Sequence, residues 1–230
     1  MKPALLCPYV PAGTELDLFE GKAFVSLVGF LFQNTRILGL LPIWPIQNFE
    51  EINLRFYIKK KVGRETRRAV CFIKEIVPSR LISWAARVLY NEPYTTFPTR
   101  HRFSLKKGSK GSRGGIFSYE WKTGGRWIGF ALKTGMELRR FKRNSLEEFI
   151  LEHYWGYTRQ KDGSTKEYGV NHVPWRVSNG KKIFVDRKLA NFYGKDFSKV
   201  LKRKSNSVFL AEGSNVSVFS GSEVSRPVMH

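Results

Sequence analysis

The chain has few cysteines, and its histidines stand far apart. Its 230 residues include 2 cysteines, Cys7 and Cys71, and 4 histidines. This spacing argues against a disulfide-stapled scaffold and against zinc motifs such as His-Glu-x-x-His. We therefore expect two reduced thiols, no metal and no other cofactor, as is typical of a cytoplasmic protein.

The sequence also has no long apolar run. Residues 23–32 and 37–46 are apolar, but the polar residues 33–36 separate them. Each run is shorter than the roughly 20 residues that a membrane-spanning helix needs. The first residues lack the uninterrupted apolar core that follows the basic start of a secretory signal. The sequence thus predicts a cytoplasmic protein without a membrane span.

Acidic residues are scarce, because 19 Asp and Glu stand against 40 Lys and Arg, for a net charge of +21. An excess of this kind attracts nucleic acid, anionic membrane surfaces or acidic small molecules, and does not choose among them. Aromatic residues are interspersed with four basic runs, at 59–68, 106–113, 139–143 and 199–204. Non-specific nucleic-acid binding is therefore an alternative, although no helix-turn-helix, ribonucleoprotein or zinc motif accompanies these runs.

Apolar and aromatic residues, by contrast, are plentiful. They make up 42% and 14% of the sequence, enough for one domain with a sizeable core. The last residues, 221–230, are predicted to form a flexible tail. Strand, helix and hairpin patterns occur along the chain at 22–32, 48–58, 67–77, 79–90, 100–106, 115–121, 126–133, 145–153, 154–170 and 207–219.

Some of these patterns predict more detail. Residues 22–32 are apolar on both faces, which fits a central strand. The helix at 79–90 is expected to start at Pro78-Ser79 and to stop at Asn91-Glu92-Pro93, with a core-facing stripe of Leu81, Ile82, Ala85, Val88 and Leu89. Residues 145–148 fit a capping box, and 207–219 have a strand, turn, strand pattern.

The stretch 48–58 has the clearest pattern. From Glu51 it alternates, with Ile52, Leu54, Phe56 and Ile58 on one side and Glu51, Asn53, Arg55 and Tyr57 on the other. This period of two predicts a strand with one apolar face. The polar row is either an ordinary solvated face or, in a barrel, the lining of a binding cavity.

Five segments in order resemble the YqjF-like family, a group of uncharacterised bacterial proteins whose fold is similar to that of acetoacetate decarboxylase. They are YVPAGTELD at 9–17, FEEINLRFY at 49–57, FIKEIVP at 72–78, VNHVPW at 170–175 and VFLAEG at 208–213. The resemblance implies a mainly β protein over residues 1–220, with a closed or cone-like β-barrel, a few short helices and a central cavity. Relatives carry a further strand before the Pro-Ala-Gly-Thr motif, and this sequence has only nine residues before Val10.

The resemblance also has implications for the reaction. In acetoacetate decarboxylases an acidic residue at the position of Glu51 faces the cavity, and a lysine after the proline that follows the helix forms a Schiff base. Here Pro93 is followed by Tyr94, and a second carboxylate expected on the strand at 23–30 is also missing. Schiff-base decarboxylation is therefore not expected. Lys74 is a substitute amine only if it is not a paired surface lysine.

We predict that the protein binds a small, anionic organic ligand, with or without turnover. The candidate site residues are Glu51, Asn53, Arg55, Tyr94 and His172. Glu51 would be a polar anchor or general acid–base, and Arg55 would clamp a carboxylate. Beside an arginine Glu51 would stay ionised unless its burial outweighs that charge. His172 either orients the ligand or makes a structural hydrogen bond to backbone.

A third class is an assembly protein that forms a homo-oligomer through an exposed sheet edge left by the missing first strand. This alternative and nucleic-acid binding remain open at the level of the sequence.

Overall fold

The computed structural model describes residues 1–37, 41–42, 47–107, 113–135 and 137–220. The predicted tail, 221–230, lies outside them. The strands are β1 (Glu15–Leu16), β2 (Val25–Phe32), β3 (Arg36–Ile37), β4 (Leu41–Pro42), β5 (Phe49–Val62), β6 (Glu65–Val77), β7 (Tyr94–Thr96), β8 (Thr99–Lys107), β9 (Arg113–Thr123), β10 (Arg126–Gly135), β11 (Trp155–Arg159), β12 (Thr165–Asn171), β13 (Val177–Val185), β14 (Phe209–Ala211) and β15 (Ser217–Ser220). The helices are α1 (Arg80–Tyr90), α2 (Leu146–Leu151), α3 (Arg187–Phe192) and α4 (Lys195–Leu201), with 3-10 turns η1 (Pro3–Leu5) and η2 (Cys7–Tyr9).

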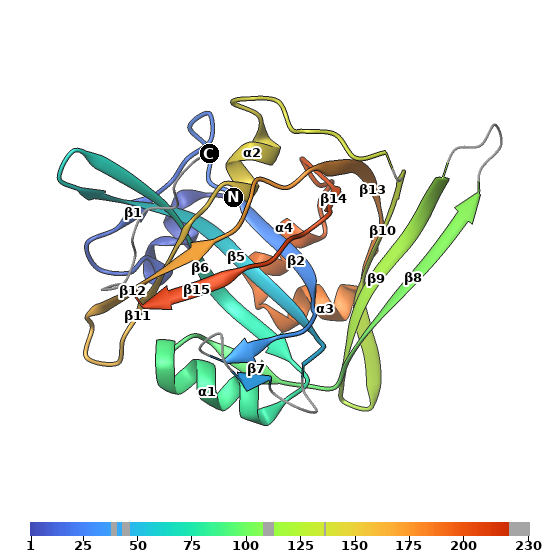
Figure 1. Cartoon of the computed structure of the whole chain (residues 1–230), viewed down its shortest axis with the longest axis horizontal. Helices are drawn as coiled ribbons and strands as arrows, with labels where there is room; N and C mark the ends of the chain where they lie inside the picture. The colour runs from blue at the N-terminus through green and yellow to red at the C-terminus, as the bar shows by residue number, and fades with distance from the viewer. Residues whose placement is uncertain (38–40, 43–46, 108–112, 136, 221–230) are drawn as a thin grey trace.

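Most of these strands belong to two sheets (Figure 1). The large sheet has 8 strands in the order β1–β5–β6–β11–β12–β15, with β2 also beside β5 and β7 also beside β6. The second sheet has 5 strands in the order β14–β13–β10–β9–β8, and its β8–β9 hairpin projects to one side of the molecule (Figure 1). The prediction of a mainly β protein with few short helices is confirmed, and the large sheet is curled.

Strand β5 is longer than predicted and is covered on both faces. The row from Ile52 to Ile58 is fully buried in the main core, together with Trp121 of β9 and Leu189 of α3. The opposite row is also mostly buried, with Glu51 4% and Asn53 0% exposed. The interpretation of this row as a solvated face is therefore wrong.

A β-bulge in β6 decides which residues join the polar row. Asn53 pairs with Glu75 and Leu54 with Lys74, but Arg55 pairs with Phe72, so β6 has one extra residue here. Directly opposed residues share a face of the sheet. Glu75 therefore lies on the same face as Glu51 and Asn53, which we call the Glu51 face of the large sheet.

The two sheets approach each other closely at Gly29 of β2. A Cβ added there would lie 2.5 Å from the ring of Tyr119 on β9. Only a residue without a side chain permits this contact. The face of β2 that carries Gly29 therefore packs toward the second sheet, while its other face belongs to the Glu51 face.

Several predicted elements are confirmed. Helix α1 begins after Ser79, whose side chain accepts a hydrogen bond from the Ile82 N–H, and ends at Asn91 in the left-handed conformation. Helix α2 begins after Ser145, which caps the Glu148 N–H as the capping-box pattern predicts. The hairpins β9–β10 and β11–β12 form where the sequence places them.

Other predictions are wrong. Strand β2 was expected to be central, but among the described strands it pairs only with β5, and all its residues are half-buried. Leu81 of the predicted core stripe and Trp84 are exposed, at 52% and 62%. The side chains of Ala85, Val88 and Leu89 in that stripe lie outside the described ones. Strands β14 and β15 join different sheets and form no hairpin.

Candidate functional site

Three predicted site residues meet on the Glu51 face. Glu51 Oε1 accepts a hydrogen bond of 2.9 Å from Asn53 Nδ2, and Glu51 Oε2 accepts one of 2.9 Å from the Tyr94 hydroxyl. Asn53 reaches this place because it stands two residues further along β5. Tyr94 reaches it because β7 pairs with β6 in parallel, with Tyr94 opposite Glu75.

Two further carboxyls lie at the same place. Glu75 is 2% and Glu92 5% exposed. Glu92 Oε1 accepts hydrogen bonds from Thr158 of β11 and Tyr168 of β12, the latter at 2.8 Å. We call Glu51, Glu75 and Glu92 the acidic cluster. It draws residues from β5, β6 and the segment after α1 into one buried region.

Burial and mutual repulsion dominate the electrostatics of the acidic cluster. Burial raises the pKa of Glu51, against weaker lowering by the hydrogen bonds from Asn53 and Tyr94 and by the charge of Arg55. Burial, Glu92 and Glu51 together raise the pKa of Glu75. Burial raises the pKa of Glu92 to about 7, against the hydrogen bonds that it accepts. The question left open by the sequence is thus answered, because burial outweighs Arg55 at Glu51.

Not every polar atom here is paired. Glu75 Oε2 and Asn53 Oδ1 are buried without a hydrogen-bond partner. Buried polar atoms in folded proteins nearly always have one, so an unpaired atom calls for an explanation. Both atoms accept hydrogen bonds, and both lie beside Glu51, whose two oxygens already have donors.

Arg55 lies on the same face but points away from the acidic cluster. Its Nη2 donates a 3.2 Å hydrogen bond to the Ile150 carbonyl, and its Cζ lies 5.9 Å from the centroid of the Tyr57 ring. Among the described residues it makes no ion pair. Arg55 is half-buried, and its Nε is buried without a hydrogen-bond partner, which leaves one N–H donor of the guanidinium unused within the fold.

His153, at the end of α2, lies near Arg55. Its ring centroid is 4.8 Å from that of Tyr57, and Nε2 is 3.9 Å from Oδ2 of Asp17. Burial lowers the pKa of His153, followed by the charges of Arg68 and Arg55, against a weaker opposing effect of the Ile150 carbonyl. Neither ring nitrogen has a hydrogen-bond partner of good geometry. His153 therefore presents a neutral imidazole at this end of the face.

His172 lies apart from Glu51, Asn53 and Tyr94. Its ring stacks between Tyr154, at 4.9 Å, and Trp175, at 4.4 Å, and its Nδ1 lies 2.9 Å from the Val173 carbonyl. This is the backbone contact that the structural interpretation of His172 predicts. The structure does not bring His172 to the acidic cluster.

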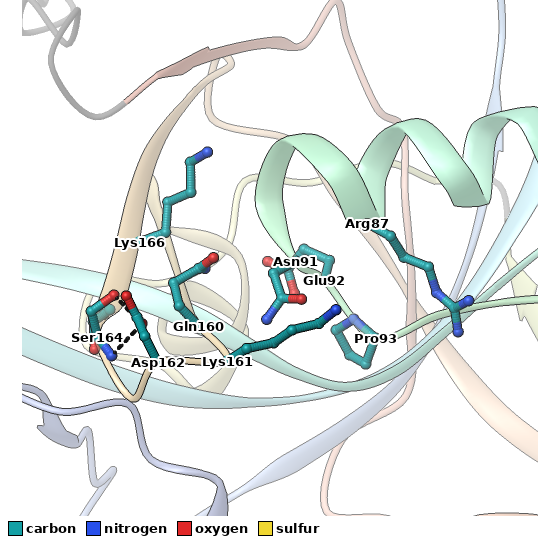
Figure 2. A pocket seen from close by; sticks show the side chains of 10 residues that line it. Arg87, Asn91, Glu92, Pro93, Gln160, Lys161, Asp162, Ser164 and Lys166 are labelled. Carbon is teal, nitrogen blue, oxygen red and sulfur yellow. Dashed lines mark hydrogen bonds between the residues drawn. The ribbon is translucent and has the colours of Figure 1, made fainter.

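An outer cleft of about 1040 Å³ lies between the end of α1 and the β11–β12 hairpin. Figure 2 shows Lys161, Asp162 and Lys166 on the side of the hairpin, with the side chain of Lys161 extending across toward Pro93. Glu92 lines this cleft and also belongs to the acidic cluster. It therefore links the surface to the buried carboxyls.

Sequence reasoning missed Glu75, Glu92 and His153 as site residues. In the sequence Glu75 follows Lys74, which suggests an ordinary surface ion pair, and Glu92 stands in the Asn-Glu-Pro sequence that ends a helix. A usable signal existed for Glu92, because it comes just before the Pro93-Tyr94 segment. None existed for Glu75, whose orientation depends on the bulge.

The substitute amine does not lie at the acidic cluster. Lys74 Nζ is 4.3 Å from the centroid of the Phe192 ring, on the helical side of the large sheet. The hydroxyl of Tyr94, which follows Pro93, bonds Glu51.

A family model matches residues 1–215. The chain belongs to the DUF2071 family. The description of that family is "Uncharacterized conserved protein (COG2071)". This DUF2071 protein is 25% identical over 181 residues to the uncharacterized protein YqjF of Bacillus subtilis (strain 168), covering 77% of this chain and 69% of YqjF. The resemblance drawn from the five motifs is confirmed.

Solved structures confirm the fold of this DUF2071 protein. Acetoacetate decarboxylase from Legionella pneumophila superposes with a TM-score of 0.54 at 11% identity, covering 95% of this chain and 78% of that one. MppR, an enduracididine biosynthesis enzyme, superposes with 0.54 at 15% identity, covering 96% and 79%, in a complex with the condensation product of pyruvate and imidazole 4-carboxaldehyde. Such identities establish an acetoacetate decarboxylase-like fold and leave the activity open.

None of the described helices is long and apolar enough to cross a membrane. The described His, Cys, Asp and Glu residues form no group with metal-binding geometry.

Proposed function

We propose that this DUF2071 protein binds a small organic carboxylic acid on the Glu51 face of its large sheet. The observation that carries the proposal is the pairing of a buried, incompletely satisfied acidic cluster with an arginine that has no ion-pair partner among the described residues. In a structural ion pair the polar atoms have hydrogen-bond partners within the protein, whereas in a ligand site some polar atoms are left for the ligand to bind. Perturbed carboxyl pKa values point the same way.

The roles follow from the geometry. Arg55 takes the ligand carboxylate, because a guanidinium matches that group with two parallel hydrogen bonds. Glu51, Asn53 and Tyr94 hold the polar remainder. Val28 of β2 and Phe72 of β6 share this face, since they pair with Asn53 and Arg55, and both are half-buried. These two side chains would contact the ligand between the acidic cluster and Arg55.

Proton transfer is the chemical step that these residues support best. A carboxyl with a pKa of about 7, as at Glu92, is suited to give or take a proton at neutral pH. Glu51 stays the candidate general acid–base, because it lies nearest to Arg55 along the strand.

Pyruvate is the natural first probe, because MppR has a pyruvate complex and the same fold. We expect wild-type protein to bind pyruvate or another member of a panel of small carboxylic acids in calorimetric titrations. Arg55→Ala and Glu51→Ala should weaken that binding about 10- to 100-fold, the worth of a charge-assisted hydrogen bond. Glu51→Gln, which keeps the shape of the side chain, is the companion variant.

The matched control is Arg102→Ala, because Arg102 has an exposed guanidinium with 67% side-chain exposure on β8. Circular dichroism should show the fold unchanged in all variants. Unchanged affinity in both Arg55→Ala and Glu51→Ala would sink the site assignment. Failure of the wild-type protein to bind any acid of the panel would sink the function.

Nucleic-acid binding is the second hypothesis, and one observation weakens it. In the basic run 59–68, Lys59 pairs with Glu15, Lys60 and Arg67 with Glu167, and Arg68 with Asp17. Lysines and arginines that already pair with carboxylates of the protein neutralise fewer phosphates. Fewer counterions are then released from the nucleic acid, so its binding is weaker. Tight oligonucleotide binding at physiological salt would restore this hypothesis.

A further inference from the structure

We propose that the ligand of the Glu51 face is a zwitterion, an elongated amino acid whose carboxylate meets Arg55 and whose ammonium group meets Glu51, Asn53 and Glu75. This inference rests on the proposed function and specifies the class of ligand. It comes from the opposite polarity of the two ends of one strand face.

The acidic end is short of donors. Asn53 Nδ2 and the Tyr94 hydroxyl each donate to Glu51, and the unpaired atoms that remain are Asn53 Oδ1, which only accepts, and Glu75 Oε2, which only accepts once the carboxyl is ionised. An ammonium group brings three N–H donors and no acceptor. It therefore supplies what these buried atoms lack.

Charge favours the same assignment. A carboxylate placed here would join three carboxyl groups that already repel one another, since Glu51 and Glu92 each raise the pKa of Glu75. A cation at this place would relieve the repulsion. The basic end has the opposite balance, because Arg55 lacks an ion pair among the described residues and His153 is neutral.

The spacing gives the length of the ligand. The Cα atoms of Glu51 and Arg55, four residues apart on one strand face, are separated by roughly 13 Å at about 3.3 Å per residue. Side chains that stand perpendicular to the sheet keep that separation, and Arg55 would turn from the Ile150 carbonyl to bind the ligand. Two hydrogen bonds of about 2.8 Å leave roughly 7–8 Å between the two charged groups of the ligand. An extended chain advances roughly 1.2 Å per bond, so about six bonds separate the ammonium nitrogen from the carboxylate carbon. The half-buried Val28 and Phe72 lie along this path and suit a methylene chain.

The test compares four probes of defined chemistry: 6-aminohexanoate, hexanoate, hexylamine and glycine. In calorimetric titrations of the full chain, 6-aminohexanoate should bind at least about tenfold more tightly than each of the others, since it alone reaches both ends. Glu75→Gln should reduce the ratio of the affinities for 6-aminohexanoate and hexanoate. Glu137→Gln, at an exposed glutamate, should leave that ratio as in the wild type.

The outcomes separate this inference from the function beneath it. If hexanoate or another simple carboxylate binds as tightly as 6-aminohexanoate, the zwitterion is wrong and the carboxylate site stands. If hexylamine alone binds, the ligand is not a zwitterion and Arg55 does not bind a carboxylate. If none of the probes and no acid of the panel binds, the proposed function itself fails.

Discussion

The free energy of unfolding should fall as the pH rises from about 4.5 to about 7. Glu51, Glu75 and Glu92 all have a pKa raised in the folded state. Within this window the folded protein binds more protons than the unfolded chain, so deprotonation favours unfolding. For Glu92 alone, a rise from 4.5 to about 7 corresponds to a loss on the order of 3 kcal/mol. The loss is complete above the folded-state pKa.

Chemical denaturation of wild type and Glu92→Gln at a series of pH values measures this effect. The amide keeps an oxygen for Thr158 and Tyr168 but cannot ionise, so the variant should lose the part of the slope that Glu92 causes, directly and through its repulsion of Glu75, and be the more stable protein at pH 8. His153 contributes an opposite slope, because its lowered pKa makes the neutral ring more stable in the folded protein as pH rises. The contribution of His153 cancels in the difference between the two proteins, which leaves the effect of Glu92 and of its repulsion of Glu75.

Glu137→Gln is the control for this comparison, because Glu137 is exposed. Its pH profile should follow the wild type. Equal slopes for wild type and Glu92→Gln would show that the carboxyl of Glu92 is not destabilised in the fold.

Gly156→Ala should destabilise the protein by about 2–4 kcal/mol, as overpacking and one lost buried hydrogen bond predict. Gly156 of β11 lies opposite Tyr168 of β12, and an added Cβ would lie 2.1 Å from Cζ of the Tyr168 ring. The ring of Tyr168 would have to move, and its hydroxyl would lose the hydrogen bond to Glu92. Thermal and denaturant unfolding measure the loss.

Gly135→Ala is the matched control, because Gly135 also lies in a strand and an added Cβ would come no closer than 3.7 Å to another atom. Its effect should stay within about 0.5 kcal/mol. If both alanine variants are equally stable, Tyr168 is not fixed over Gly156 and the support of Glu92 must be revised.

Local patterns in the sequence predicted much of the fold. The alternation of apolar and polar residues located β5, and capping residues located both ends of α1. Both signals are local, because the residues that make them lie within a few positions of each other in the sequence. The helices α3 and α4 and the strand β13 were missed. In β13 the Gly180-Lys181-Lys182 sequence breaks the apolar alternation, and the strand exists because it pairs with β10 and β14.

The candidate site was predictable only in part. Glu51 and Asn53 follow from the alternation of one strand, and Tyr94 from the position after Pro93. The contribution of Glu75 depends on an extra residue in β6, and that of Glu92 on contacts with β11 and β12. His153 approaches Tyr57 from a different element. Such tertiary placement leaves no periodic trace in the sequence.

The most direct test of the central claim is a pair of crystal structures, one grown with pyruvate and one with 6-aminohexanoate. We predict ligand density on the Glu51 face, with a carboxylate against the guanidinium of Arg55, and in the second crystal an ammonium group beside Glu51 and Asn53. Density confined to the outer cleft, beside Lys161 and Lys166, would contradict the account, and the Glu51 face would then be a structural feature of the sheet.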